Sequence, residues 1–235
     1  MTEWKAKRFW DNAAVSETDG GFGVGLDGRP VRSPAKTPLI VPTLALAEEI
    51  AAEWQAQHDV IDPRTMPFTR SANAALDKVA PQFEEVAGLI ADYGGTDLLC
   101  YRADHPQELI DRQTAQWDPV LDWAAVALGV RLRVGTGVMH VSQDQAALDR
   151  LAAQVRVLDP FRLTAFHDLV GLSGSLILGF AVTEGFRGAD EAWSLSRIDE
   201  KWQAEKWGED EEAADIVEAK RLAFLHAARF FALCG

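Results

Sequence analysis

The segment "GGFGVGLDGRPVRSPAKTPLIVP" (Gly20–Pro42) differs in composition from the rest of the chain. It alternates Val24 and Leu26 with small or polar residues. Asp27-Gly28 follows, and this pair favours a tight hairpin turn because both residues tolerate positive φ. Four prolines between residues 30 and 42 exclude a long helix. We therefore predict a small antiparallel β domain over residues 1–42.

From Thr43 onward the apolar residues recur with a helical period. Thr43 is expected to cap a helix that carries Leu46, Ile50 and Trp54, with Trp54 packed into the core. The stretch 81–95 predicts a second helix that stops at its two final glycines. A longer helical stretch reaches residue 128, and Pro119 within it predicts a kink or a restart.

The remaining residues predict further helices. Residues 131–141 have the pattern of two short strands, and Ser142 with Gln145 has capping-box spacing. Asp159-Pro160 is expected to open an apolar helix, and the run Leu169–Val182 to be a buried core helix. Two more helices are expected over about 188–206 and 211–232. The predicted fold class is α+β, with a small N-terminal antiparallel β domain (1–42) followed by a larger, mostly α-helical domain (43–235).

Composition restricts the possible partners. The chain has 235 residues, a formal net charge of −13 and a pI of about 4.8, which argues against nucleic acid or an anionic membrane surface. Cys100 and Cys234 lie far apart with no CxxC motif, as expected for a reduced cytoplasmic protein. The most apolar run is too short to span a bilayer, and the first residues lack the apolar core of a secretion signal. We expect no membrane insertion.

Three motifs that suggest chemistry have better explanations as structure. "GFGVG" (Gly21–Gly25) leads into a hairpin, whereas a phosphate site needs a following helix. "GLSGS" (Gly171–Ser175) lacks the final glycine of a nucleophile elbow, and its small residues are expected to let helices approach closely. The five histidines lack metal-ligand spacing, and the side chains of His167 and Asp168 are expected to point in different directions. We predict no metal, no cofactor and no catalytic residue.

The segment "IDEKWQAEKWGEDEEAAD" (Ile198–Asp215) combines eight carboxylates with two tryptophans. On a helix, Leu195, Ile198 and Trp202 share one stripe, Asp199 lies on its shoulder, and Glu200 points to solvent. The alternatives for Asp199 are a salt bridge or cap within the protein and a contact to a partner. Trp207-Gly208 is expected to end the helix. The candidate partner-binding residues are Asp199, Glu200, Trp202, Gln203 and Trp207.

The same segment permits a different class of function. Asp199 with Glu205 or Glu209 could form the acid–base pair of a carboxylate-dependent hydrolase or lyase, if their environments separate their pKa values. Two acids that face each other across a deep pocket would support this alternative, whereas acids along one exposed helix would not. A permanent subunit of a larger complex is a third possibility.

Four segments together resemble one family, the assembly chaperones that bind the α subunit of the ATP synthase catalytic head. They are "LDGRPVRSPAKTPLIVPT" (26–43), "LAEEIAAEWQAQHDVIDPRTMPFTRSANAALD" (46–77), "YGGTDLLCYRA" (93–103) and the segment 198–215. The match keeps order and spacing over most of the chain. The cluster EW..Q…I.P..MP carries most of the specificity.

The resemblance implies a non-enzymatic role. Such a chaperone holds the unassembled α subunit transiently and prevents its aggregation until β subunits replace the chaperone. The resemblance also implies a small β domain followed by a helical domain, and it links function to an acidic position that matches Asp199, where the family often has Glu. The lack of a targeting segment suggests a bacterial cytoplasmic member, or a mature form from the mitochondrial matrix. We expect the free chaperone to be monomeric.

Overall fold

The computed structural model describes residues 7–208 and 211–235. Contacts along the chain divide it into two compact units. The first, here called the sheet unit, comprises the residues up to Phe83 together with Asp159–Ala165 and Arg229–Gly235. The second, the helical unit, comprises Glu84–Leu158 and Phe166–Ala228. The two units are described separately below.

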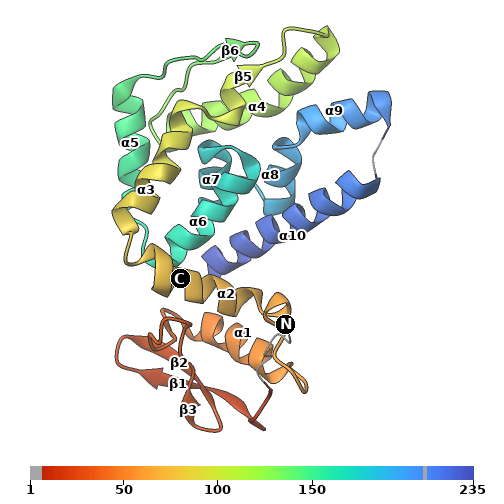
Figure 1. Ribbon diagram of the computed structural model, residues 1–235. Coiled ribbons are helices and arrows are strands. Elements are labelled where there is room, and N and C mark those ends of the chain that lie inside the picture. The colour runs from red at the N-terminus through yellow and green to blue at the C-terminus, as the bar shows by residue number, and fades with distance from the viewer. Residues whose placement is uncertain (1–6, 209–210) are drawn as a thin grey trace. The chain divides into compact units, whose positions relative to one another are not determined.

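Short strands and longer helices make up the chain (Figure 1). The strands are β1 (Ala13–Thr18), β2 (Gly21–Leu26), β3 (Arg29–Pro30), β4 (Ile40–Val41), β5 (Tyr101–Arg102) and β6 (Gly135–Thr136). The α-helices are α1 (Leu44–Gln55), α2 (Pro67–Ala74), α3 (Phe83–Ala91), α4 (Gln107–Ala127), α5 (Gln145–Arg156), α6 (Pro160–Ser173), α7 (Leu176–Thr183), α8 (Ala189–Leu195), α9 (Ile198–Trp207) and α10 (Glu211–Leu233). The predicted α+β class, with its N-terminal antiparallel sheet, is confirmed.

An antiparallel sheet forms the start of the sheet unit. Strand β2 pairs with β1 on one side and with β3 and β4 on the other. Asp27 and Gly28 connect β2 to β3 with φ values of 48° and 79°. Both values lie in the left-handed region, as a two-residue hairpin requires. The predicted Asp-Gly hairpin is confirmed.

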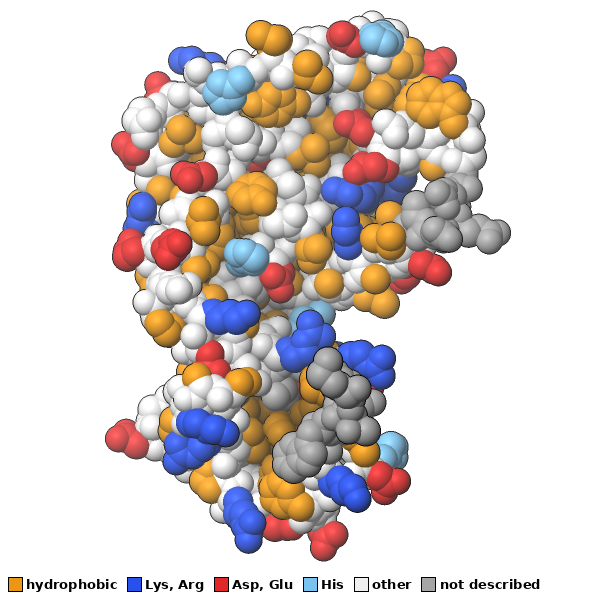
Figure 2. Space-filling model, in the orientation of Figure 1, with side chains coloured by type: hydrophobic (Ala, Val, Ile, Leu, Met, Phe, Trp, Pro, Cys, Tyr) orange, Lys and Arg blue, Asp and Glu red, His pale blue; other side chains and the backbone are white. Residues whose placement is uncertain are grey.

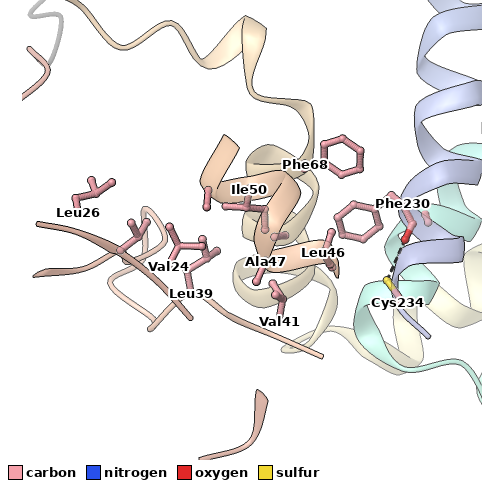
Figure 3. Close-up of a cluster of buried hydrophobic side chains, with 14 of the residues drawn as sticks. Val24, Leu26, Leu39, Val41, Leu46, Ala47, Ile50, Phe68, Phe230 and Cys234 are labelled. Carbon is pink, nitrogen blue, oxygen red and sulfur yellow. Dashed lines mark hydrogen bonds between the residues drawn. The ribbon is translucent and has the colours of Figure 1, made fainter. Parts of the chain in front are cut away.

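The core of the sheet unit lies between this sheet and α1. Figure 3 shows Val24, Leu39 and Val41 on the side of the sheet that faces Leu46 and Ile50 of α1. All five side chains are buried, since the hydrophobic alternation of the strands and the helical period of α1 each present one apolar face. Phe68 and Phe230 stack beside them with ring centroids 6.3 Å apart.

Side chains satisfy the free backbone groups at the starts of α1 and α2. Thr43 caps α1 by accepting a hydrogen bond from the Leu46 N–H, as predicted. Helix α2 has no side-chain cap of its own. Instead, the Glu53 carboxylate of α1 accepts from the Phe68 and Thr69 N–H groups at 2.6 and 2.8 Å. Glu53 thereby ties α1 to α2.

Helix α4, in the helical unit, continues through Pro119. The predicted restart at this proline is therefore wrong. Trp117 and Val120 are fully buried beside it, and the Trp117 indole N–H donates to the Leu195 carbonyl at 2.8 Å. This packing compensates for the backbone hydrogen bond that the helix loses at the proline.

The run Leu169–Val182, expected as one helix, is divided between α6 and α7. Gly174 separates them with φ of 73°, a conformation that ends a helix and favours glycine. The Ser175 hydroxyl then caps α7 by accepting from the Leu178 N–H at 3.0 Å. The close helix approach expected of the "GLSGS" glycines occurs elsewhere, at Gly179, where an added Cβ would lie 2.9 Å from a methyl carbon of Val170.

Three further expectations need correction. The helix expected over 188–206 is broken between α8 and α9. Asp144, not Ser142, caps α5, and its carboxylate accepts from the N–H groups of Ala146 and Ala147. In the expected strand region 131–141, the described backbone has one two-residue strand, β6, which pairs in parallel with β5.

The predicted boundary between residues 42 and 43 falls inside the sheet unit, where α1 packs on the strands. As a division into separate folding domains it stays a prediction. Within residues 7–208 and 211–235, no helix is both long and apolar enough to cross a membrane.

Candidate partner-binding groove

One face of α9 lines a groove in the helical unit. The residues that α9 contributes are spaced three or four positions apart, so they lie on one side of the helix. They are Asp199, Trp202, Gln203, Lys206 and Trp207. The other lining residues come from the start of α4 and the turn before it: His105, Pro106, Glu108 and Leu109. The groove has a volume of about 700 Å³.

The buried side-chain amide of Gln113 holds the Asp199 carboxylate in place. The Gln113 side chain of α4 is 1% exposed, and its Nε2 donates to Asp199 Oδ1 at 2.7 Å. The Gln113 Oε1 accepts from the Ala103 N–H at 2.8 Å. Asp199 itself is half-buried and has no ion pair among the described residues. Gln113 therefore fixes the carboxylate at the groove without neutralising it.

The two tryptophans of α9 have different environments. Trp202 is 6% exposed, and two cations lie near its ring: the Arg112 guanidinium carbon at 4.9 Å and Lys206 Nζ at 4.6 Å from the centroid. Trp207 is 78% exposed and makes no ring contact within the described part of the chain. Trp202 is a packing residue at the base of α9, whereas Trp207 presents its ring to solvent.

Ion pairs and hydrogen bonds join α9 to α4 along the groove. Lys206 pairs with Glu108 at 3.6 Å. The Arg112 guanidinium forms a bidentate pair with Glu205, with both N–O distances at 2.8 Å. Over α9, at the upper right of Figure 1, hydrophobic side chains lie next to acidic and basic ones on the molecular surface (Figure 2). A surface of this kind, apolar groups within a polar rim, is typical of reversible protein–protein contacts.

Four of the five sequence-predicted residues line the groove: Asp199, Trp202, Gln203 and Trp207. Glu200 does not, since it is exposed and pairs with Arg197 at 2.9 Å. The groove residues before and within α4, and Gln113, were not predicted from the sequence. A buried glutamine inside an apolar helical stripe was the available signal, because buried amides normally have hydrogen-bond partners.

The carboxylate pair of the hydrolase or lyase alternative is not supported. Hydrogen bonding to Arg112 lowers the pKa of Glu205, whereas a general acid needs a raised pKa. Asp199 is bonded to an amide and not to a second acid. Glu209 lies outside the described residues.

The remaining motifs have structural positions. The "GFGVG" segment lies in strand β2 and precedes a hairpin. The His167 Nδ1–H donates a hydrogen bond to the Asp168 carboxylate at 3.0 Å, so the expectation that their side chains diverge is wrong. This bond raises the pKa of His167. No group of three or more potential ligands suited to a metal ion occurs among the described residues.

The cluster EW..Q…I.P..MP has a structural role within the sheet unit. Glu53 caps α2, as described above. Trp54 packs against Trp10 with centroids 5.3 Å apart, in agreement with its expected core packing. Gln57 is 4% exposed; it accepts from the Asp62 N–H and donates to the Thr65 hydroxyl. Met66 is buried directly before α2.

Comparison with known proteins identifies the family. Residues 7–125 match the family model described as ATP12 chaperone protein. The chain belongs to this family of ATP synthase assembly chaperones. Among relatives, the mitochondrial protein atp12 of Schizosaccharomyces pombe is 27% identical over 222 residues, which cover 89% of this chain and 76% of that protein.

Solved structures agree with the fold. The crystal structure of Atp12 from Paracoccus denitrificans has a TM-score of 0.96 and 54% identity, over 99% of this chain and 100% of that one. An aspartate-to-lysine mutant of P. denitrificans Atp12p has a TM-score of 0.97 and 53% identity over all of both chains. The Atu1473 protein from Agrobacterium tumefaciens has a TM-score of 0.92 and 43% identity, over 97% of this chain and 86% of that one.

Proposed function

We propose that this chain binds the unassembled α subunit of the ATP synthase and prevents its aggregation until β subunits take the chaperone's place. It acts as a monomer, without cofactor or catalysis, in the bacterial cytoplasm. The bacterial relatives of high identity support this compartment. Membership in the ATP12 chaperone family supports the assembly role, and the sequence resemblance supplies the α subunit as the partner.

The groove beside α9 is the proposed site of contact. The observation that carries this assignment is the Trp207 side chain, 78% exposed at the rim of a groove that also holds the half-buried Asp199. Exposed tryptophan next to charged groups is unusual on a free monomer and common among the residues that dominate interfaces. Glu200 lies outside the groove, and we assign it to the polar rim of the contact.

A physical need matches this surface. A subunit that awaits its neighbours exposes apolar surface and unpaired strand edges, and both promote aggregation. A chaperone must cover that surface and later leave it. Burial of a few large apolar side chains within a rim of ion pairs meets both requirements, because the rim adds little to the affinity.

The test is aggregation of purified α subunit, followed by light scattering. We expect an equimolar amount of this chain to suppress the scattering and to co-purify with the α subunit. Unchanged scattering, together with a pull-down that recovers a different major partner, would contradict the proposal. Addition of β subunits should release the chaperone; stable retention at fixed stoichiometry would instead identify a permanent subunit.

Trp207→Ala tests the contact site within the same assay. We expect at least about a tenfold loss in affinity for the α subunit, the size of effect typical of an interfacial tryptophan. Leu89→Ala is the control, since Leu89 is also exposed (60%) and apolar but lies on α3, outside the groove. Equal effects of both substitutions would show that the groove is not the contact site.

A further inference from the structure

The lining of the groove carries one more carboxylate than it carries ammonium groups. Its lining has two carboxylates, Asp199 and Glu108, and one ammonium group, Lys206. Lys206 is paired with Glu108, and His105 is paired with the neighbouring Asp104. The carboxylate in excess is therefore Asp199, which the Arg102 guanidinium attracts without forming an ion pair with it, since Arg102 pairs with Asp118.

Asp199 can accept a further hydrogen bond from a ligand. Its Oδ1 accepts from Gln113, and no side chain or backbone group of residues 7–208 and 211–235 bonds to Oδ2. Because the carboxylate is half-buried, a cation that reaches it must lose part of its hydration. Guanidinium is more weakly hydrated than ammonium, and its planar fork matches a carboxylate, so arginine suits this site better than lysine.

The other end of the groove is suited to an apolar group. Trp207 lies eight residues after Asp199, which places it about 12 Å further along the helix axis. Pro106 and Leu109 line the same groove. In an extended segment, two side chains about 12 Å apart belong to residues about four positions apart.

We propose that the groove recognises an extended segment of the α subunit that carries an arginine and, about four residues away, a large apolar side chain. The arginine pairs with Asp199, and the apolar side chain packs on Trp207. Gln113 is the positioning residue, because its buried amide holds the Asp199 carboxylate toward the groove. This inference rests on the proposed function, since it takes the α subunit as the partner.

Overlapping peptides that cover the α subunit sequence, probed with the full-length chain, provide the test. We expect the bound peptides to share the arginine and the apolar residue at this spacing. Replacing the arginine with citrulline, which keeps the shape and removes the charge, should weaken binding about tenfold or more. Equal binding of the arginine and citrulline peptides would overturn the inference, and so would the absence of any bound peptide.

The Asp199→Asn variant, measured with the arginine and citrulline peptides, completes a double-mutant cycle. This variant should bind the arginine and citrulline peptides equally weakly, because the two changes remove the same interaction. Asp92→Asn makes the same chemical change at an exposed carboxylate outside the groove, and it should distinguish the two peptides as the wild type does. If the wild type retains intact α subunit but ignores the arginine, the proposed function stands and this inference fails.

Discussion

Asp97 is a fully buried carboxylate that joins its own turn to the start of α7 in the helical unit. It accepts from the Leu99 N–H at 3.0 Å, from the Ser175 hydroxyl at 2.8 Å and from the Ile177 N–H at 3.0 Å. These bonds favour the charged form, but desolvation by burial outweighs them and raises the pKa of Asp97 to about 6. Asp97 is thus a structural residue whose ionisation works against folding.

This raised pKa predicts a pH dependence of stability. Between about pH 3.8 and about pH 6 the folded state holds a proton that the unfolded chain has released, so the free energy of unfolding falls as the pH rises. From about pH 5 to about pH 7 the expected loss is about 1 kcal/mol. Urea unfolding at a series of pH values measures it.

Asp97→Asn should remove this contribution to the pH slope, while Asp92→Asn, at an exposed carboxylate, should keep it. The comparison uses the slope rather than the absolute stability, because asparagine also changes the hydrogen bonds at the site. Identical slopes for the wild type and Asp97→Asn would contradict the assignment.

Single residues of the site were only partly predictable. The helical period placed Asp199 on the shoulder of a buried stripe, and the structure agrees: Ile198 and Trp202 are buried and Asp199 is half-buried. The sequence gives no sign that Gln113 bonds to Asp199, since 86 residues separate them. Periodicity describes one helix at a time, and this contact needs the packing of two.

At the scale of elements, the glycine between α6 and α7 decides where a continuous apolar run breaks. Hydrophobicity alone predicted one helix, because apolar stretches, 169–172 and 176–182, lie on both sides of the short Ser-Gly-Ser segment that contains Gly174. The backbone instead turns at Gly174, and Ser175 starts a new helix that Asp97 helps to cap. Caps that come from distant segments are invisible to local pattern, and the same limit hid the start of α2, which Glu53 caps.

Gly174→Ala should destabilise the protein by about 1–2 kcal/mol, because φ of 73° is costly for any residue with a Cβ. The added Cβ would be 3.9 Å from Leu98, so backbone strain and not a clash is the cause. Gly171→Ala is the matched control: it lies within α6 with open space around it, and alanine there should stabilise by about 0.5–1 kcal/mol. Thermal unfolding of both variants tests the opposite signs.

The start of α5 offers a second test at this scale. Asp144→Ala should cost about 1 kcal/mol, since it removes the acceptor for two backbone N–H groups. Ser142→Ala, at the position that the capping-box spacing suggested, should cost little. If urea unfolding instead showed a larger loss of stability for Ser142→Ala than for Asp144→Ala, Ser142 would be the cap.

At the scale of the whole molecule, the sequence was sufficient for the fold class and the family. Hairpin turn residues and the change of hydrophobic period at Thr43 predicted a sheet followed by helices, as observed. The sequence did not predict which segments form each unit. Residues 159–165 and 229–235 belong with the sheet unit, and no local pattern indicates that the C-terminal helix contributes Phe230 to the core beside Phe68.

The two cysteines provide one probe for each unit. Both thiols are free and buried, Cys100 in the helical unit and Cys234 in the sheet unit, and burial raises the pKa of each to about 12. We expect slow reaction with a thiol reagent in the folded protein and fast reaction of both thiols in urea. Mass spectrometry of the labelled peptides reads the two sites separately, and a thiol that reacts in buffer at the rate seen in urea would contradict its burial.

The bridges between α4 and α9 have a mechanical consequence. Lys206–Glu108 and Arg112–Glu205 face water, so solvent and dissolved ions compete for them. Trp202 is buried, so dissolved ions do not compete for its packing contacts. The groove is therefore flexible where these exposed ion pairs lie and rigid where Trp202 is buried. The width of the groove should depend on ionic strength. Spin labels on the two helices would show this as a broader distance distribution in concentrated salt.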